Sequence, residues 1–105
     1  MLKHITMWNL KPFAAGNDRE KNYELIKEKA AATARKCPTV RSLEFGRGLV
    51  DGKDFYMVQI VTFDDEKGLK EFLDSPVHQE MHAFAVEVRA ERAAYDYIVE
   101  DPVTL

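Results

Sequence analysis

The segment Phe55-Tyr56-Met57-Val58-Gln59-Ile60-Val61-Thr62-Phe63 decides the fold of this chain, because it is apolar on both faces. As a strand it places its large side chains alternately, with Phe55, Met57, Val61 and Phe63 on one face and Tyr56, Val58 and Ile60 on the other. An antiparallel sheet that is covered by helices on one side normally leaves a polar second face in water. The sequence therefore predicts that something else covers the second face, and a second copy of the same sheet is the simplest cover.

Hydrophobic periodicity predicts the other elements around this strand. Alternation predicts further strands over residues 2–10, 40–50 and 92–99. Helical spacing and capping residues predict a helix from Arg19 to Lys36, a short helix after Asp64 or Asp65, and a helix from Pro76 to about Ala90. Asp51-Gly52-Lys53 is typical of a hairpin turn. The order βαββαβ is the ferredoxin-like α+β arrangement, with helices on one face of a four-stranded antiparallel sheet.

Composition indicates a single globular domain over residues 1–105 and excludes several kinds of partner. The net charge of -3 provides no basic surface for nucleic acid. Cys37 is the only cysteine, so no intrachain disulfide can form, and a reducing cytoplasmic location is predicted. No apolar run is long enough to span a membrane, and polar side chains interrupt the first residues, so neither a membrane partner nor a signal peptide is expected.

Ser75-Pro76-Val77-His78 predicts the start of a helix and contains the main candidate for chemistry. Ser75 is a good N-cap, and Pro76 suits the first helical position. His78 then lies in the first turn, where the positive end of the helix dipole favours a neutral imidazole. A neutral imidazole at the mouth of a pocket can act as a general base, and His82 lies one turn further along the same helix face.

Simpler interpretations of the same residues stand beside this one. A histidine in the first turn is often only a surface or capping residue. The His78–His82 spacing is that of helical metal ligands, but the Glu of H-E-x-x-H and a third ligand are missing, so no metal is predicted. Ordinary core packing would account for the large side chains Trp8, Tyr23, Phe72, Met81 and Phe84.

Four segments together resemble a known family: Lys3-His4-Ile5, Pro38-Thr39-Val40-Arg41-Ser42-Leu43-Glu44-Phe45-Gly46, Pro76-Val77-His78 and Tyr95-Asp96-Tyr97. In this order and spacing they resemble the stress-responsive A/B barrel domain (Dabb) family, within the dimeric α+β barrel group. The resemblance covers most of the chain. It implies a homodimer in which two ferredoxin-like subunits pack sheet against sheet, as the doubly apolar strand independently indicates.

The resemblance also implies a site and a cofactor-free chemistry. A plant polyketide cyclase of this family closes a ring with the histidine that matches His78 as base, assisted by a tyrosine six residues earlier. Phe72 occupies that position here, and a phenyl ring cannot donate a hydrogen bond. His4 matches another histidine of the family and is the second catalytic candidate. The residues expected to line the same cavity and contact a ligand are Trp8, Tyr23, Phe72, Met81 and His82.

The sequence leaves several functions open. In the first, His78 removes a proton α to a carbonyl of a small aromatic or polyketide-like substrate, while His4, Tyr23 or Tyr56 orients the oxygen. In the second, a dimeric barrel binds a small ligand or has a structural role in stress, without turnover. A cofactor-free monooxygenase of the wider group is a third. A cavity of about 300 Å³ or more, with both histidines pointing into it, would favour ligand chemistry. A solvent-exposed His78, with Trp8 and Phe72 filling the space, would favour the structural role.

Overall fold

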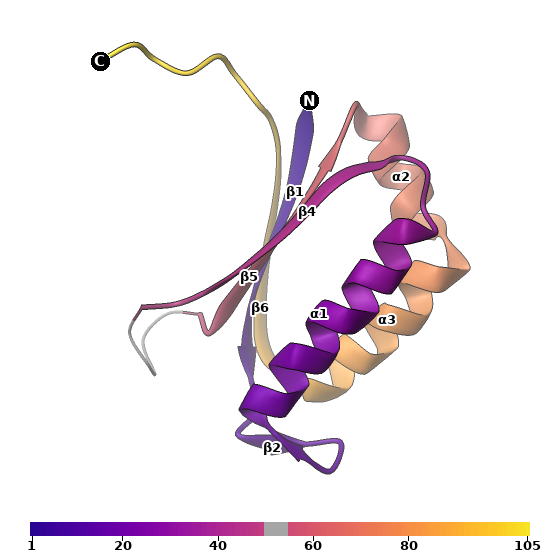
Figure 1. Ribbon diagram of the computed structural model, residues 1–105, viewed down its shortest axis with the longest axis vertical. Coiled ribbons are helices and arrows are strands. Elements are labelled where there is room, and N and C mark those ends of the chain that lie inside the picture. Colours follow the sequence, from indigo (N-terminus) through magenta and orange to yellow (C-terminus); the bar gives the residue numbers. More distant parts are fainter. Residues whose placement is uncertain (50–54) are drawn as a thin grey trace.

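The computed structural model describes residues 1–49 and 55–105 of the chain. Its main sheet is antiparallel and has the strand order β4-β5-β1-β6, formed by β1 (Leu2–Leu10), β4 (Val40–Arg47), β5 (Met57–Phe63) and β6 (Arg89–Ile98). One face of the sheet is covered by α1 (Arg19–Arg35), α2 (Glu66–Asp74) and α3 (Pro76–Val88), as Figure 1 shows. This is the predicted ferredoxin-like α+β fold. The predicted hairpin turn at residues 51–53 lies outside the described residues.

A small second hairpin connects β1 to α1. It pairs β2 (Phe13–Ala14) with β3 (Asn17–Asp18). The turn between them has positive φ at Ala15 and Gly16, at 52° and 77°. The paired residues are too few to give the alternating pattern that predicts a strand.

The strand β1 alternates strictly between buried and half-buried residues, and the buried set is Leu2, His4, Thr6, Trp8 and Leu10. Residues two apart along a strand share one face, so alternation alone groups these five residues. Residues opposite one another in an antiparallel pair point to the same face. His4 lies opposite Asp96 of β6, and Thr6 lies opposite Gln59 of β5. The register therefore gathers polar side chains from three strands under the helices.

The opposite face of the sheet is apolar at its centre, and no helix in the described part of the chain covers it (Figure 1). Ile5 lies opposite both Ile60 and Tyr95, and Met7 lies opposite Val58. Tyr95, next to Ile5, is 66% exposed. Val58 and Ile60 occupy the face that was predicted for them.

The prediction for Tyr56 is wrong. Tyr56 precedes β5, and its ring packs edge-on against Tyr23, with 5.8 Å between the ring centroids. Its hydroxyl donates to Glu20 of α1 at 2.9 Å, and Glu20 also accepts a hydrogen bond from Arg47. These contacts hold Tyr56 on the helix side. Tyr56 lies just before the first residue of β5, where strict alternation no longer holds, although its backbone N–H still bonds the Trp8 carbonyl.

The strand β4 ends at Arg47 and not at residue 50 as predicted. A side chain at Gly48 would place its Cβ 2.7 Å from the carbonyl oxygen of Phe55, which is closer than packed atoms approach. The glycine therefore allows a close approach of the Phe55 backbone.

Capping residues fix where the three helices begin. Asp18 accepts from the backbone N–H of Lys21, and Asp65 accepts from that of Gly68. Ser75 accepts from the backbone N–H of His78 at 3.2 Å, which confirms the predicted cap of α3. Each cap satisfies one N–H that the first helical turn leaves without a partner.

The end of α3 differs from the prediction. The helix ends at Val88 and passes directly into β6, which starts at Arg89 and not at Arg92. The Arg89 N–H still bonds the Ala85 carbonyl, while its φ and ψ of -83° and 146° are those of a strand. Arg89 and Arg92 consequently sit at the junction between helix and sheet.

The buried side chains between sheet and helices form two separate apolar clusters. One contains Trp8, Leu10, Tyr23, Ile26, Met57, Met81, Ala85 and Val88. The other contains Leu2, Cys37, Val61, Phe63, Leu69 and Phe72. Along β1 and β5, the residues between the two clusters are His4, Thr6 and Gln59, all of which are buried. Buried polar groups cost free energy unless they form hydrogen bonds, so this polar strip indicates a candidate functional site.

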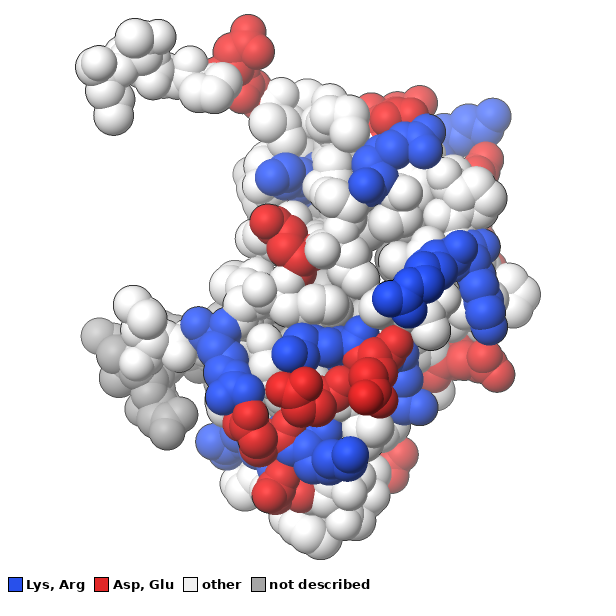
Figure 2. Space-filling view, in the orientation of Figure 1, with Lys and Arg blue, Asp and Glu red and all other residues white. Residues whose placement is uncertain are grey.

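The outer surface of α1 carries mixed charges. Glu20 pairs with Arg47, and Glu24 pairs with Lys27 at 3.2 Å. Figure 2 shows acidic and basic side chains interspersed on this side of the molecule, with no continuous basic area on the visible face. None of the described helices combines the length and apolar composition needed to cross a membrane.

Candidate functional site

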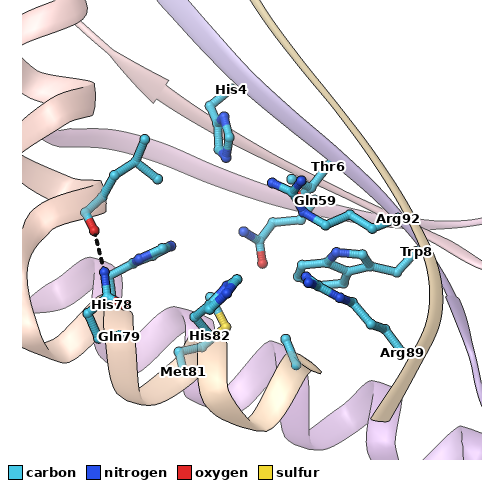
Figure 3. A pocket seen from close by; sticks show the side chains of 12 residues that line it. His4, Thr6, Trp8, Gln59, His78, Gln79, Met81, His82, Arg89 and Arg92 are labelled. Atoms are coloured by element: carbon cyan, nitrogen blue, oxygen red, sulfur yellow. Dashed lines mark hydrogen bonds between the residues drawn. The ribbon is translucent and has the colours of Figure 1, made fainter. Parts of the chain in front are cut away.

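A pocket of about 240 Å³ lies between the sheet and α3, where the two apolar clusters leave a gap (Figure 3). It is partly open to solvent. Its lining residues are His4, Thr6, Trp8, Gln59, Leu73, His78, Gln79, Met81, His82, Ala85, Arg89 and Arg92. The volume is smaller than the 300 Å³ set out above, but both candidate histidines line the pocket.

The α3 side of the pocket follows from helical spacing. His78, Met81, His82 and Ala85 recur at i, i+3, i+4 and i+7, which places them on one face of the helix. The rings of His78 and His82 stack with their centroids 6.0 Å apart. Phe72 also packs against the His78 ring, with 4.7 Å between the ring centroids. His78 therefore contacts two rings at the edge of the pocket.

His4 approaches from the opposite side, on β1, as Figure 3 shows. Its Nδ1 donates to a carboxylate oxygen of Asp96, which lies directly opposite it on β6. A carboxylate on Nδ1 orients the ring and leaves Nε2 for contact with a ligand. Within residues 1–49 and 55–105, no group of three His, Cys, Asp or Glu side chains is arranged to hold a metal ion.

The pocket collects buried polar atoms that have no hydrogen-bond partner. Among the described residues these atoms are Thr6 Oγ1, Trp8 Nε1, Gln59 Oε1, His78 Nδ1 and Arg89 Nη1. All five belong to residues that line this pocket. An unsatisfied buried polar group costs about 1–3 kcal/mol, so water or the polar groups of a ligand must supply the missing bonds. This concentration distinguishes the pocket from the other hollows of the surface.

The environment of His78 keeps its imidazole neutral. Burial lowers the pKa of His78 below its ordinary value of 6.5, and the neighbouring His82 and His4 lower it further. The Leu73 carbonyl has a smaller, opposite effect and raises the pKa of His78. It does not form a hydrogen bond with Nδ1. The pKa of His82 is also lowered, first by burial and then by Arg89 and Arg92. At neutral pH both rings are available to accept a proton.

Two arginines complete the pocket at the junction of α3 and β6. Burial and the nearby charge of Arg92 lower the pKa of Arg89. Neither arginine makes an ion pair with any described residue, and no described Asp or Glu lines the pocket. Asp96 is close but is bonded to His4. The pocket therefore has positive charge with no anionic partner of its own.

The structure brings five of the predicted site residues together. His4, Trp8, His78, Met81 and His82 all line the pocket.

The other two predicted residues lie outside the lining. Tyr23 packs with Tyr56 on the far part of the core, and Phe72 lies behind His78 against Phe63. A ligand contact of either remains only a prediction.

Sequence reasoning missed Thr6, Gln59, Arg89 and Arg92 as lining residues. Thr6 shares the predicted inner face of β1, and Gln59 is a polar residue in an apolar strand, so both carried a usable signal. The two arginines lie at the boundary between α3 and β6, which the sequence prediction placed two to three residues too late.

These features define a ferredoxin-like α+β protein with a pocket between its sheet and its last helix. Residues 2–99 match the model of the Stress responsive A/B Barrel Domain, Dabb, and the chain belongs to this family. No curated protein matches the sequence.

Solved structures share the fold at low sequence identity. A hydroxynitrile lyase from Passiflora edulis has a TM-score of 0.82 and 16% identity over 98% of this chain and 96% of that chain. A dimeric ferredoxin-like protein of unknown function from Thermobifida fusca has a TM-score of 0.77 and 17% identity over 93% and 90%. A cofactor-independent oxygenase from Streptomyces nogalater has a TM-score of 0.76 and 13% identity over 97% and 95%. At such identities the likeness establishes the fold alone.

Proposed function

We propose that the protein binds a small organic molecule in this pocket and that His78 acts there as a general base, without a cofactor. The observation that carries the proposal is the state of His78. Its ring is partly buried, its lowered pKa keeps it neutral, and its Nδ1 lacks a partner while the ring borders a cavity shared with His4. A base of this kind must be neutral at the working pH and within reach of the proton it removes.

The reaction class that suits these groups is proton abstraction next to a carbonyl. The proton passes from the α carbon to the His78 imidazole, and the C–H electron pair moves into an enolate. The enolate oxygen then needs a donor, and the Trp8 N–H and the Thr6 hydroxyl are buried donors at the pocket that lack partners. His4, held by Asp96, can orient the substrate from the sheet side.

The pocket volume favours a small substrate. A cavity of about 150 Å³ holds benzene. The pocket of about 240 Å³ therefore has room for one substituted ring or a short chain, and a larger substrate would extend through its open side into solvent. Among the solved structures that share the fold are a hydroxynitrile lyase and an oxygenase that is cofactor-independent, which supports an enzyme that relies on side chains alone.

Phe72 favours a second candidate function, which is ligand binding without turnover. Phe72 contacts the His78 ring at 4.7 Å but offers no hydroxyl to assist it. A protein that only binds its ligand would retain the pocket and its polar atoms, and it would show no dependence of any reaction on His78.

Homodimer formation through the uncovered face of the sheet is the second part of the proposal. Its support is the apolar surface around Ile5, Met7 and Ile60, which no described helix covers. Relatives of the same fold are described as dimeric. Burying this surface against a second copy removes apolar area from water, at about 25 cal/mol per Å².

Deuterium exchange into the methyl group of acetophenone, followed by NMR in D₂O, tests the base. The native protein is expected to accelerate the exchange, and His78→Gln should lower the rate by about 10²-fold or more. Arg35→Gln, which introduces the same residue at an exposed site on α1 away from the pocket, is the control and should retain the rate. The rate should hold at pH 7 and fall only on acidification below pH 6.5, because the pKa of His78 is lowered. Equal rates for the native protein and His78→Gln would favour binding without turnover.

A further inference from the structure

We propose that the pocket selects a small carboxylate and that Arg89 and Arg92 hold its carboxylate group. The inference rests on the proposed function, because it concerns the same pocket, and it adds the chemical class of the ligand. It also assigns a task to two side chains that the proton transfer does not use.

The pocket contains two arginines and no described acidic side chain. Arg89 is half-buried and has Nη1 without a hydrogen-bond partner. Arg92 is close enough to disfavour the charge on Arg89. Two neighbouring guanidinium groups without an anion repel each other, and burying unpaired charge costs free energy. An anion between them removes both penalties, whereas a neutral ligand leaves both in place and a cation increases them.

The positions of Arg89 and Arg92 on β6 direct both side chains into the pocket. Arg89 is the first residue of β6, directly after α3, and the Lys11 N–H bonds the carbonyl of the preceding Val88 at 2.9 Å. Arg92 lies opposite Trp8 in the β1–β6 ladder, so it shares the helix-facing side of the sheet. Figure 3 shows both arginines reaching into the pocket from the side of Trp8, away from His78. A carboxylate held there places the rest of the molecule towards the histidines.

Buried polar atoms without hydrogen-bond partners line the same pocket as the arginines. Arg89 Nη1 is a buried donor without a partner, and a carboxylate accepts at two oxygens with about four lone-pair positions. The planar guanidinium fork also matches the planar carboxylate. Gln59 Oε1 is a buried acceptor, which can receive a hydroxyl or amine substituent of the ligand. The pocket therefore offers donors for one anionic group and an acceptor for a second, neutral group.

Benzoate and its uncharged counterpart benzamide test the inference, since they differ in charge and hardly in size. Binding of each to the full chain is measured by NMR titration. The native protein is expected to bind benzoate more tightly than benzamide, and Arg92→Gln should weaken benzoate binding about tenfold or more while leaving benzamide unchanged. Arg92 is exposed, so this change should not disturb folding. Arg35→Gln removes the same charge from an exposed site on α1 and should preserve the preference for benzoate.

Several results would overturn the inference. Equal affinities for benzoate and benzamide in the native protein would refute the anion site. A preference for benzoate that survives both Arg92→Gln and Arg89→Gln would refute it as well. Tighter binding of phenyl phosphate than of benzoate would mean that the arginines select a phosphate ester and not a carboxylate. A preference for benzoate together with no His78-dependent exchange would refute the role of His78 as a base and would still support the anion site. Failure of both probes to bind would refute the pocket and the anion site together.

Discussion

Ile60→Glu is expected to convert a dimer into monomers. Ile60 is near the middle of the uncovered face, opposite Ile5 on one neighbouring strand and Glu44 on the other. A carboxylate at this position would be buried without a partner between two sheets and would lie beside the like charge of Glu44. Such a penalty of several kcal/mol weakens association by roughly 10²-fold or more. Sedimentation velocity over a range of protein concentrations measures the change.

Val86→Glu provides the matched control, because it places the same charge at another apolar residue. Val86 lies on α3 and is 47% exposed, so it does not belong to the sheet face. This variant should sediment like the native protein. If Ile60→Glu also sediments like the native dimer, the dimer must use another surface. If the native chain itself is a monomer, the apolar face has no second copy over it.

Phe63→Ala is expected to lower the free energy of unfolding by about 3–5 kcal/mol. Phe63 is 0% exposed and packs against Phe72, with 5.4 Å between the ring centroids. Phe72 in turn supports the His78 ring, so the cavity left by the substitution would loosen one wall of the pocket. Small domains have only about 5–15 kcal/mol of stability, so this is a large fraction. Urea denaturation followed by circular dichroism measures the loss.

Phe13→Ala is the control for the same side-chain deletion at the surface. Phe13 is 69% exposed, and a surface substitution of this kind usually changes stability by no more than about 0.5 kcal/mol. Matching urea midpoints for Phe63→Ala and Phe13→Ala would mean that Phe63 is not packed in the core described above.

The inner face of the sheet was predictable because strand alternation has a fixed period. Leu2, His4, Thr6, Trp8 and Leu10 follow from alternation alone, and all five are buried.

The helix starts were also predictable, although the sequence left a choice between Asp64 and Asp65 for the cap of α2. The side chains of Asp18, Asp65 and Ser75 accept the hydrogen bonds that capping residues are selected to accept.

The rest of the site depends on information that local sequence does not contain. The β1–β6 register places Asp96 opposite His4, and a register is a property of two distant segments. The passage from α3 into β6 has no Gly or Pro to mark it, so Arg89 could not be placed in the pocket from periodicity. Tyr23 and Phe72 have the aromatic character of ligand contacts, but packing against Tyr56 and Phe63 places them outside the pocket lining.

The most direct test of a neutral base in this pocket is an NMR titration of the His78 imidazole, assigned by comparison with His78→Gln. The expected result is a pKa below the ordinary 6.5 and a shift of the His78 ring resonances when acetophenone is added at pH 7. A pKa at or above 6.5, with ring resonances that do not respond to acetophenone, would contradict it.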